Sequence, residues 1–221
     1  MNKEARRASE AAEVLEDFPA KSWLRNARAV AVIPSVKKAA FGFGARWGSG
    51  LISMRDENGC WIPPSYIHIT GINAGFQAGF QATDLVLIFT NDGAVRSLLR
   101  GKLTLNADAS GAAGAVGRKG QVGVPILVNS GIYSFSRSKG VFAGVSLDGA
   151  AITIADTSNQ RVYGKYISGT EILMDRRVEP NDVVAPFLIA LATYSAGRPG
   201  ELETAQQNTT APEAETVAQT Q

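Results

Sequence analysis

Glycine placement limits the folds open to this chain more than any other feature of its sequence. The 221 residues include 23 glycines, which fall inside apolar runs instead of in linkers. Glycine within a strand pattern marks tight turns and places where two backbones approach closely. Hydrophobic residues make up 45% of the chain and charged residues 19%, which are ordinary values for a soluble globular protein. We therefore expect one large, β-rich domain.

A hairpin in the second half of the chain is the clearest strand signal. Two alternating segments, Tyr133–Arg137 and Val141–Leu147, are joined by three residues that end in glycine. A loop of this kind suits a hairpin that needs one positive φ. Arg137 and Lys139 place two positive charges at its tip. A turn at Asp148-Gly149 then leads into another strand, which predicts a three-stranded meander.

The first strand is predicted at Ala29–Ile33, where the apolar run ends at Pro34. A turn or a single helical turn that carries Lys37 and Lys38 is expected to follow it. Phe41–Ser53 is unusual because aromatic and small residues alternate with glycine and Arg46, so one face of a strand there is nearly bare. A bare face allows close approach by a neighbouring backbone or by a ligand, and close sheet packing is the simpler reading.

Asn58-Gly59 predicts a two-residue hairpin, and Cys60 beside it is expected to be a buried, inert thiol. The four-residue unit repeated in residues 75–82 is interpreted as a tight sheet corner, and the single histidine, His68, as structural. Further strands are predicted at Tyr66–Ile72, Asp84–Thr90, Leu103–Leu105, Gly111–Val116, Ile126–Val128 and Ala151–Ala155.

Helices are expected at both ends of the chain and between strands. They are predicted at Asn2–Phe18, Ala20–Asn26, Ala94–Arg100 and Pro186–Tyr194, with short helical or irregular segments at Ser158–Tyr166 and Gly169–Met174. The fold class is therefore α+β: a compact, predominantly antiparallel β body, sandwich or barrel-like, with N-terminal and C-terminal helices packed on it.

Three parts of the chain are distinguished. Residues 1–19 form an amphipathic helix, which packs on the body in one reading and lies in a bilayer interface in the other. Residues 20–196 form the main domain. The composition of residues 197–221 supplies no core, so a disordered acidic tail is predicted there.

Charge is unevenly distributed along the sequence. The chain has 22 basic and 20 acidic residues, and four of the acidic residues lie in residues 201–221, so the remainder carries 22 − 16 = +6. Such an excess suits an anionic partner but falls short of a dedicated nucleic-acid binder, so no nucleic acid is expected. The candidate lipid-binding residues lie in basic turns: Lys37, Lys38, Arg118, Lys119, Arg137 and Lys139.

Catalytic and metal-binding residues are scarce. One histidine and one cysteine exclude most nucleophilic triads and metal clusters, so neither an enzyme nor a cofactor is expected. No apolar run reaches the roughly 20 residues of a membrane-spanning helix. The N-terminus lacks the apolar core of a secretory signal, which predicts a cytoplasmic or peripheral membrane location.

Several stretches together resemble the SYLF domain family. The resemblance covers roughly Ala20 to Tyr194, and Tyr133–Gly149 is its longest part. Its other parts are Ala31-Val-Ile-Pro34, Gly42-Phe-Gly44, Gly75-Phe-Gln77, Asp84–Phe89, Gly117-Arg118 and Glu171-Ile-Leu173. After Arg118 the sequence departs from the family's acidic, alanine-containing run, so a role built on that segment is not carried over. The resemblance implies a β-rich α+β domain that binds phosphoinositides or other anionic lipids, and eukaryotic members also bind actin filaments.

Two functions of different kinds follow. The first is a non-catalytic module that recognises anionic phospholipids, with phosphoinositide-type headgroups, through its basic turns. The second is a protein-interaction or scaffold domain whose partner is a filament or another scaffold protein. A carrier of a small hydrophobic ligand is a further alternative, because a glycine-faced β body has room for a cavity.

Overall fold

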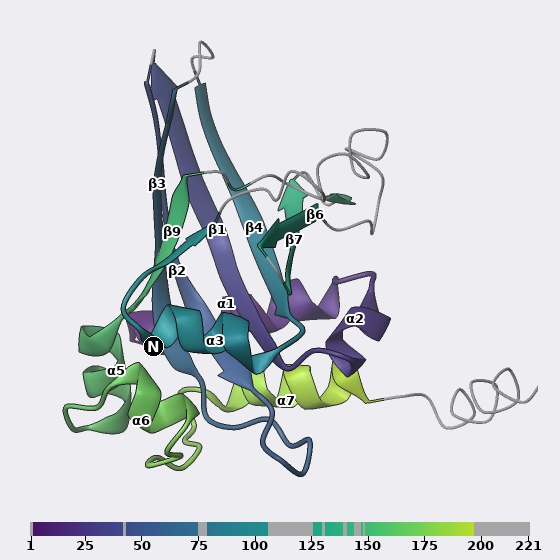
Figure 1. The fold of residues 1–221 in the computed structure, drawn as a ribbon, viewed down its shortest axis with the longest axis vertical. Helices are drawn as coiled ribbons and strands as arrows, with labels where there is room; N and C mark the ends of the chain where they lie inside the picture. Colours follow the sequence, from purple (N-terminus) through teal and green to yellow (C-terminus); the bar gives the residue numbers. More distant parts are fainter. Residues whose placement is uncertain are drawn as a thin grey trace, which may run out of the picture.

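The computed structural model describes residues 2–41, 43–74, 79–105, 126–129, 131–138, 141–143, 147 and 149–196 (Figure 1). The strands form one antiparallel sheet in the order β5-β9-β3-β2-β1-β4-β7-β6, and β8 pairs with β7. The strands are β1 Ala29–Phe41, β2 Phe43–Met54, β3 Ser65–Ala74, β4 Gly79–Phe89, β5 Leu103–Leu105, β6 Ile126–Asn129, β7 Ile132–Ser138, β8 Val141–Ala143 and β9 Ala150–Ile154. The helices are α1 Lys3–Glu16, α2 Lys21–Arg25, α3 Asp92–Leu99, α5 Asp156–Tyr163, α6 Gly169–Leu173 and α7 Ala185–Ser195.

The four long strands at the centre of the sheet have Greek-key order. β1 and β2 form an antiparallel hairpin, β3 pairs with the free edge of β2, and β4 pairs with the free edge of β1. The resulting order, β4-β1-β2-β3, places the fourth strand beside the first. Because this hairpin lies between β3 and β4, β1 and β2 are interior strands with a neighbouring strand on each side.

The sheet curves until its two ends meet. Asn129 Nδ2 of β6 donates a hydrogen bond of 3.0 Å to the carbonyl oxygen of Thr104 in β5, and these two strands lie at opposite ends of the strand order. Val95 and Leu98 of α3 are buried in a core cluster with residues of both end strands. The α+β class and the antiparallel body are confirmed, and the barrel-like form of that body is nearer to the structure than the sandwich.

The helices α1, α2 and α7 cover one face of the sheet, and α3 packs on the opposite face. The buried side chains of α1, α2 and α7 and of the segment that joins α1 to α2 share a second core cluster with sheet residues; among them are Leu15, Phe18, Leu24, Phe187 and Leu191. The Tyr66 hydroxyl donates a hydrogen bond of 3.0 Å to the carbonyl oxygen of Glu4, which ties α1 to β3. In this structure α1 therefore packs on the body, as the first of its two readings predicted.

The prediction that the first strand ends at Pro34 is wrong. β1 continues to Phe41 through a β-bulge, where the register with both neighbouring strands shifts. Pro34 is accommodated because the hydrogen bonding between strands is interrupted at the bulge, so the N–H that proline lacks is not needed there. Ser35 adopts a positive φ of 49°, and its N–H donates to Asp84 Oδ1 at 2.9 Å. Lys37 and Lys38 consequently lie in a strand and not in the turn that was expected.

The predicted three-stranded meander is also wrong. β7 and β8 do form a hairpin, but β9 pairs with β3 and β5 on the far side of the central strands. A meander would place β9 beside β8, but β8 is a three-residue strand paired with β7, and β9 instead takes the edge of β3 that β2 leaves free. Gly149, with φ at 72°, reverses the chain as expected, but a turn does not determine which edge the next strand joins.

The segment at Asn58-Gly59 is a longer loop than predicted. Arg55 and Trp61 form a bridge, and the Asp56 carboxylate accepts hydrogen bonds from the Asn58 and Cys60 N–H groups at 2.9 and 2.8 Å. Cys60 is exposed, so its predicted burial is wrong. The alternating pattern could not show this, because the chain leaves the sheet before reaching the cysteine.

Most of the remaining elements are confirmed within one to four residues of their predicted bounds. Of the repeated unit, residues 79–82 begin β4, and residues 75–78 lie outside the described part of the chain. The strand predicted at Gly111–Val116 and the tail beyond residue 196 also lie outside it. Within the described residues, no helix has both the length and the apolar character needed to cross a bilayer.

Candidate functional site

The structure describes three of the six predicted basic residues. Lys37 and Lys38 lie in β1, and Arg137 lies near the end of β7. Arg118, Lys119 and Lys139 belong to segments outside the described residues.

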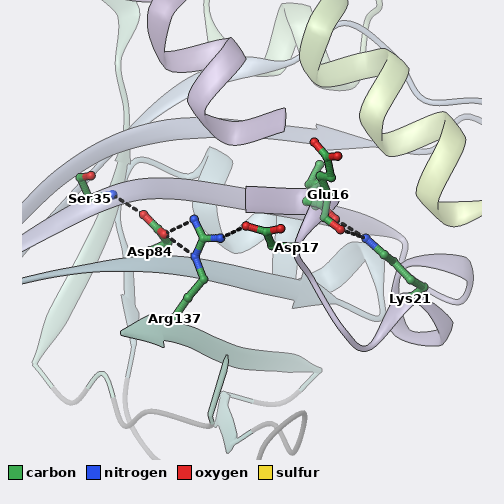
Figure 2. A network of polar contacts seen from close by, with 7 residues as sticks. Glu16, Asp17, Lys21, Ser35, Asp84 and Arg137 are labelled. Carbon is green, nitrogen blue, oxygen red and sulfur yellow. Dashed lines mark hydrogen bonds and ion pairs between the residues drawn. The ribbon is translucent and has the colours of Figure 1, made fainter. Parts of the chain in front are cut away.

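Arg137 is held in a network of ion pairs (Figure 2). Its Nε and Nη2 donate to Asp84 Oδ2 at 2.8 and 2.7 Å, and its Nη1 pairs with the Asp17 carboxylate beyond the end of α1. Although burial alone lowers the pKa of this guanidinium, the hydrogen bonds and charges of Asp84 and Asp17 raise it above its ordinary value. Since Asp84 also accepts the Ser35 N–H, the network links α1, β4 and β7 to the bulge in β1.

The bulge decides which way the two lysines face. Before it, Val32 faces the helix-covered side of the sheet together with Leu51 and Val86. After it, Lys37 lies opposite Trp47. Trp47 and Leu51 are both odd-numbered positions of β2, so their side chains lie on the same face of the sheet, and Lys37 lies on that face too. Lys38 consequently points to the other face, where it lies opposite Arg46.

Beyond the bulge, β1 to β4 extend past the helices (Figure 1). We call this part the projecting end of the sheet and define it as residues 36–41, 43–49, 69–74 and 79–83. Its β2 segment is seven residues long, which corresponds to roughly 20 Å of extended strand. On the helix-covered side, the described side chains form two rows across it: Thr70, Trp47, Lys37 and Ala82, then Ile72, Ala45, Ala39 and Phe80.

The projecting end exposes large apolar side chains. The exposed fractions are 42% for Trp47, 77% for Ile72 and 67% for Phe80. All three lie in the two rows just described, so they share one face across three strands. Sequence reasoning identified the strand that contains Trp47 but missed Ile72 and Phe80, because only strand pairing brings them beside it. The side chains of Phe41 and Phe43 lie outside what the structure describes.

The charge of the projecting end has one sign. Its described segments contain Lys37, Lys38 and Arg46 and no Asp or Glu. Asp84, which lies just below it on β4, is paired with Arg137. The end of the sheet is therefore a cationic surface with an apolar face.

His68 lies where the helix cover of this face ends. Its Nδ1 is 2.8 Å from Ser49 Oγ on the neighbouring strand. Partial burial, and then the positive charges of Arg7 and Lys3 of α1, lower the pKa of the imidazole. The neutral form is thus favoured at pH 7.

The glycine face of β2 serves sheet packing. A Cβ built on Gly50 would lie 2.1 Å from the Val32 carbonyl oxygen and 2.7 Å from Ile33 Cα, so the bulged strand approaches too closely for any side chain. A Cβ on Gly48 would meet the side chains of Ile33, Val36 and Ile69. Close backbone approach, the simpler reading of this bare face, is what the structure shows.

A separate groove of about 640 Å³ lies at the opposite end of the body. Its walls come from α7 and from the loop after β2, and include Trp61, Leu188 and Ile189. The Arg55 guanidinium stacks on the Trp61 ring at 4.3 Å from its centroid, and Trp61 Nε1 donates to Ser195 Oγ at 2.8 Å. Across the described residues, no group of three or more His, Cys, Asp or Glu side chains is arranged to hold a metal ion.

Comparison with protein families identifies the chain's relatives. Residues 70–194, more than half of the chain, match the Ysc84 family model, described as Las17-binding protein actin regulator. The chain belongs to the Ysc84 family. The resemblance to the SYLF domain is thereby confirmed, and the matched region includes β4, from which Phe80 projects, and the β7–β8 hairpin.

Members of the Ysc84 family in animals and fungi align with most of the chain. SH3 domain-containing YSC84-like protein 1 of Xenopus laevis is 36% identical over 161 residues, which cover 72% of this chain and 48% of that protein. Protein YSC84 of Saccharomyces cerevisiae is 38% identical over 156 residues, covering 69% and 33%. LAS seventeen-binding protein 3 of the same yeast is 34% identical over 171 residues, covering 76% and 37%. The chain thus spans less than half the length of these relatives. No solved structure matches it significantly.

Proposed function

We propose that this chain is a non-catalytic module that binds anionic phospholipid surfaces, with phosphoinositide-type headgroups as its ligands. The observation that carries the proposal is the projecting end, whose described segments hold three cations and no carboxylate. Each Lys or Arg near an anionic membrane contributes about 1 kcal/mol of binding free energy. Several cations at one end of an elongated sheet can approach a flat surface together, without interference from the acidic residues of the body.

The contacts differ from the basic turns expected from the sequence. Lys37 and Lys38 belong to one strand and point to opposite faces of the sheet, so both faces of the projecting end present a lysine to headgroups. Arg137 supports this arrangement indirectly, because its ion pair with Asp84 holds the bulge that orients both lysines. The proposal therefore assigns headgroup contacts to Lys37 and Lys38 and a positioning role to Arg137.

Vesicle co-sedimentation tests the proposal. The full chain is mixed with phosphatidylcholine vesicles with and without phosphatidylserine or a phosphoinositide, at low and high salt. Binding is expected only with anionic lipid and is expected to weaken with salt. At about 1 kcal/mol for each lysine, Lys37→Gln/Lys38→Gln should weaken binding roughly 30-fold.

The matched control removes two charges from the body. Arg100 and Lys102 are exposed residues beside α3, so Arg100→Gln/Lys102→Gln loses the same net charge away from the projecting end. This variant should bind nearly as well as the wild type. Binding that does not depend on headgroup charge, or an equal loss of vesicle affinity in the two variants, would refute the assignment.

A second candidate function rests on the family. The matching model is described as Las17-binding protein actin regulator, and one relative is named LAS seventeen-binding protein 3. These names favour a protein-interaction domain that acts beside an actin-regulating partner or a filament. Co-sedimentation with actin filaments tests this alternative. Pelleting that rises with filament concentration and saturates supports it, and pelleting at background level counts against it.

A further inference from the structure

We propose that the exposed apolar face of the projecting end inserts into the interfacial layer of an anionic bilayer, with Trp47, Ile72 and Phe80 as the inserting side chains. This inference rests on the proposed lipid-binding function and specifies how the protein enters the membrane. It adds a hydrophobic contribution that the lysines alone do not supply.

The geometry of the two rows fits shallow insertion. Ile72 and Phe80 lie in the row nearer the tip, and Trp47 lies one row behind them. Rows on one face are two residues apart, which corresponds to about 7 Å along the strands. Apolar faces of interfacial protein segments enter the headgroup and acyl boundary to a depth of about 5–10 Å. The spacing of the two rows is therefore comparable to the thickness of that layer, so Trp47 lies closer to the headgroups than Ile72 and Phe80, at a level where indole rings are favoured.

The positions of the lysines fit the same orientation. Lys37 lies beside Trp47 in the inner row, so with the tip inserted its ammonium group reaches the headgroups by extending along the sheet surface. Lys38 lies on the other face, one residue closer to the tip. The cations thus lie at or just behind the apolar row, where a bilayer presents its phosphates.

Charge argues against a second copy of the chain as the occupant of this face. Two copies packed face to face would place two Lys37 side chains within one apolar interface, where the described segments contain no carboxylate to pair with them. An anionic bilayer supplies both the apolar layer and the opposite charge.

Two measurements on the full chain test the insertion. The first is quenching of tryptophan fluorescence by acyl-brominated phosphatidylcholine in vesicles that contain phosphatidylserine, compared between the wild type and Trp47→Phe. Trp23 and Trp61 are common to both proteins, so the difference reports Trp47. Quenching is expected in the wild type and should be largely lost in Trp47→Phe.

The second measurement is vesicle affinity as a function of salt. Ile72→Thr/Phe80→Thr should weaken binding at least about tenfold at every salt concentration, because it removes apolar area that becomes buried. The dependence of affinity on salt should stay unchanged, whereas Lys37→Gln/Lys38→Gln should reduce it. Both replaced residues are exposed and Thr suits a strand, so the melting temperature should hold. The control Tyr166→Thr/Ile189→Thr removes two exposed apolar side chains from the body and should bind like the wild type.

The outcomes separate the two proposals. If Ile72→Thr/Phe80→Thr binds like the wild type and Trp47 is not quenched, insertion is refuted while charge-based binding stands. If the wild type binds no anionic vesicle, both proposals fail. If light scattering shows a dimer that Ile72→Thr/Phe80→Thr disrupts, or if this variant loses actin-filament binding instead of vesicle binding, the face serves a protein partner and insertion is overturned.

Discussion

Arg137 and Asp84 form a two-pronged ion pair across neighbouring strands, with Nε and Nη2 of the guanidinium 2.8 and 2.7 Å from Oδ2 of the carboxylate. The other carboxylate oxygen of Asp84 accepts the backbone N–H of Ser35 in the bulge. One carboxylate thus joins β7 to the irregular point of β1. Arg137 was predicted as a lipid-binding residue, and this pair explains why we now assign it a positioning role.

Replacing Arg137 should therefore act on stability first. Arg137→Ala leaves the largely buried Asp84 carboxylate without its ionic partner, which should cost about 2 kcal/mol of unfolding free energy. Urea denaturation measures this cost. The control Arg177→Ala removes an exposed pair with Glu171 and should lower the unfolding free energy much less. Equal costs in the two variants would show that the Arg137 pair is not structural.

The backbone of the bulge gives a second prediction. Ser35 holds a φ of 49°, which β-branched residues adopt only with strain. Ser35→Val should lower the unfolding free energy by about 1–3 kcal/mol, whereas Ser35→Gly should be close to neutral. Thermal denaturation of both variants checks this difference. If Ser35→Val is as stable as Ser35→Gly, the bulge is not required in the form described.

Gly50 should tolerate no side chain. The Cβ of Gly50→Ala would overlap the β1 backbone at Val32 and Ile33, and backbone cannot rotate away as a flexible side chain would. We expect a loss above about 3 kcal/mol or failure to fold, measured by circular dichroism and by soluble yield. Gly93→Ala in α3 is the control: its nearest heavy atom is a side-chain oxygen of Asn91 at 3.2 Å, and Ala favours a helix. Unchanged stability of Gly50→Ala would contradict the close approach of β1.

The lowered pKa of Glu4 predicts how the unfolding free energy depends on pH. Burial by itself raises the pKa of this carboxyl group, but the hydrogen bond and charge of Arg161 and the hydrogen bond from Ser158 outweigh it and lower the pKa below 4.5. The folded state thus binds the proton less readily than the unfolded state. The stabilisation is complete above pH 4.5 and is lost as the pH falls through the lowered pKa.

Urea denaturation from pH 7 to pH 3 measures this effect. The wild type should lose more unfolding free energy on acidification than Glu4→Gln, and at pH 7 the variant should be less stable by about 1 kcal/mol. Arg161 is more than half exposed, which limits the size of the effect. Parallel pH profiles for the two proteins would refute the assignment.

Local signals in the sequence predicted most elements of the fold. The helix capped by Asn91 and the buried strand from Leu85 to Phe89 follow from capping and apolar patterns that act within a few residues. The order of the strands did not follow from such signals. The turn at Gly149 is correct, but a turn does not fix the partner of the next strand, and β9 pairs with β3 and β5 instead of with β8. Pro34 was read as a strand end because its effect on a strand depends on whether the neighbouring strands accommodate a bulge.

The candidate site shows the same division. The sequence by itself determined the family, the α+β class and the positive charge of the body, because these depend on residue identity and spacing along the chain. It also pointed to Lys37 and Lys38. Only the tertiary structure decided that the bulge turns these lysines to opposite faces, that Asp84 neutralises Arg137, and that Trp47, Ile72 and Phe80 share one exposed surface. Contacts between strands far apart in the sequence set all three, so no local pattern contains them.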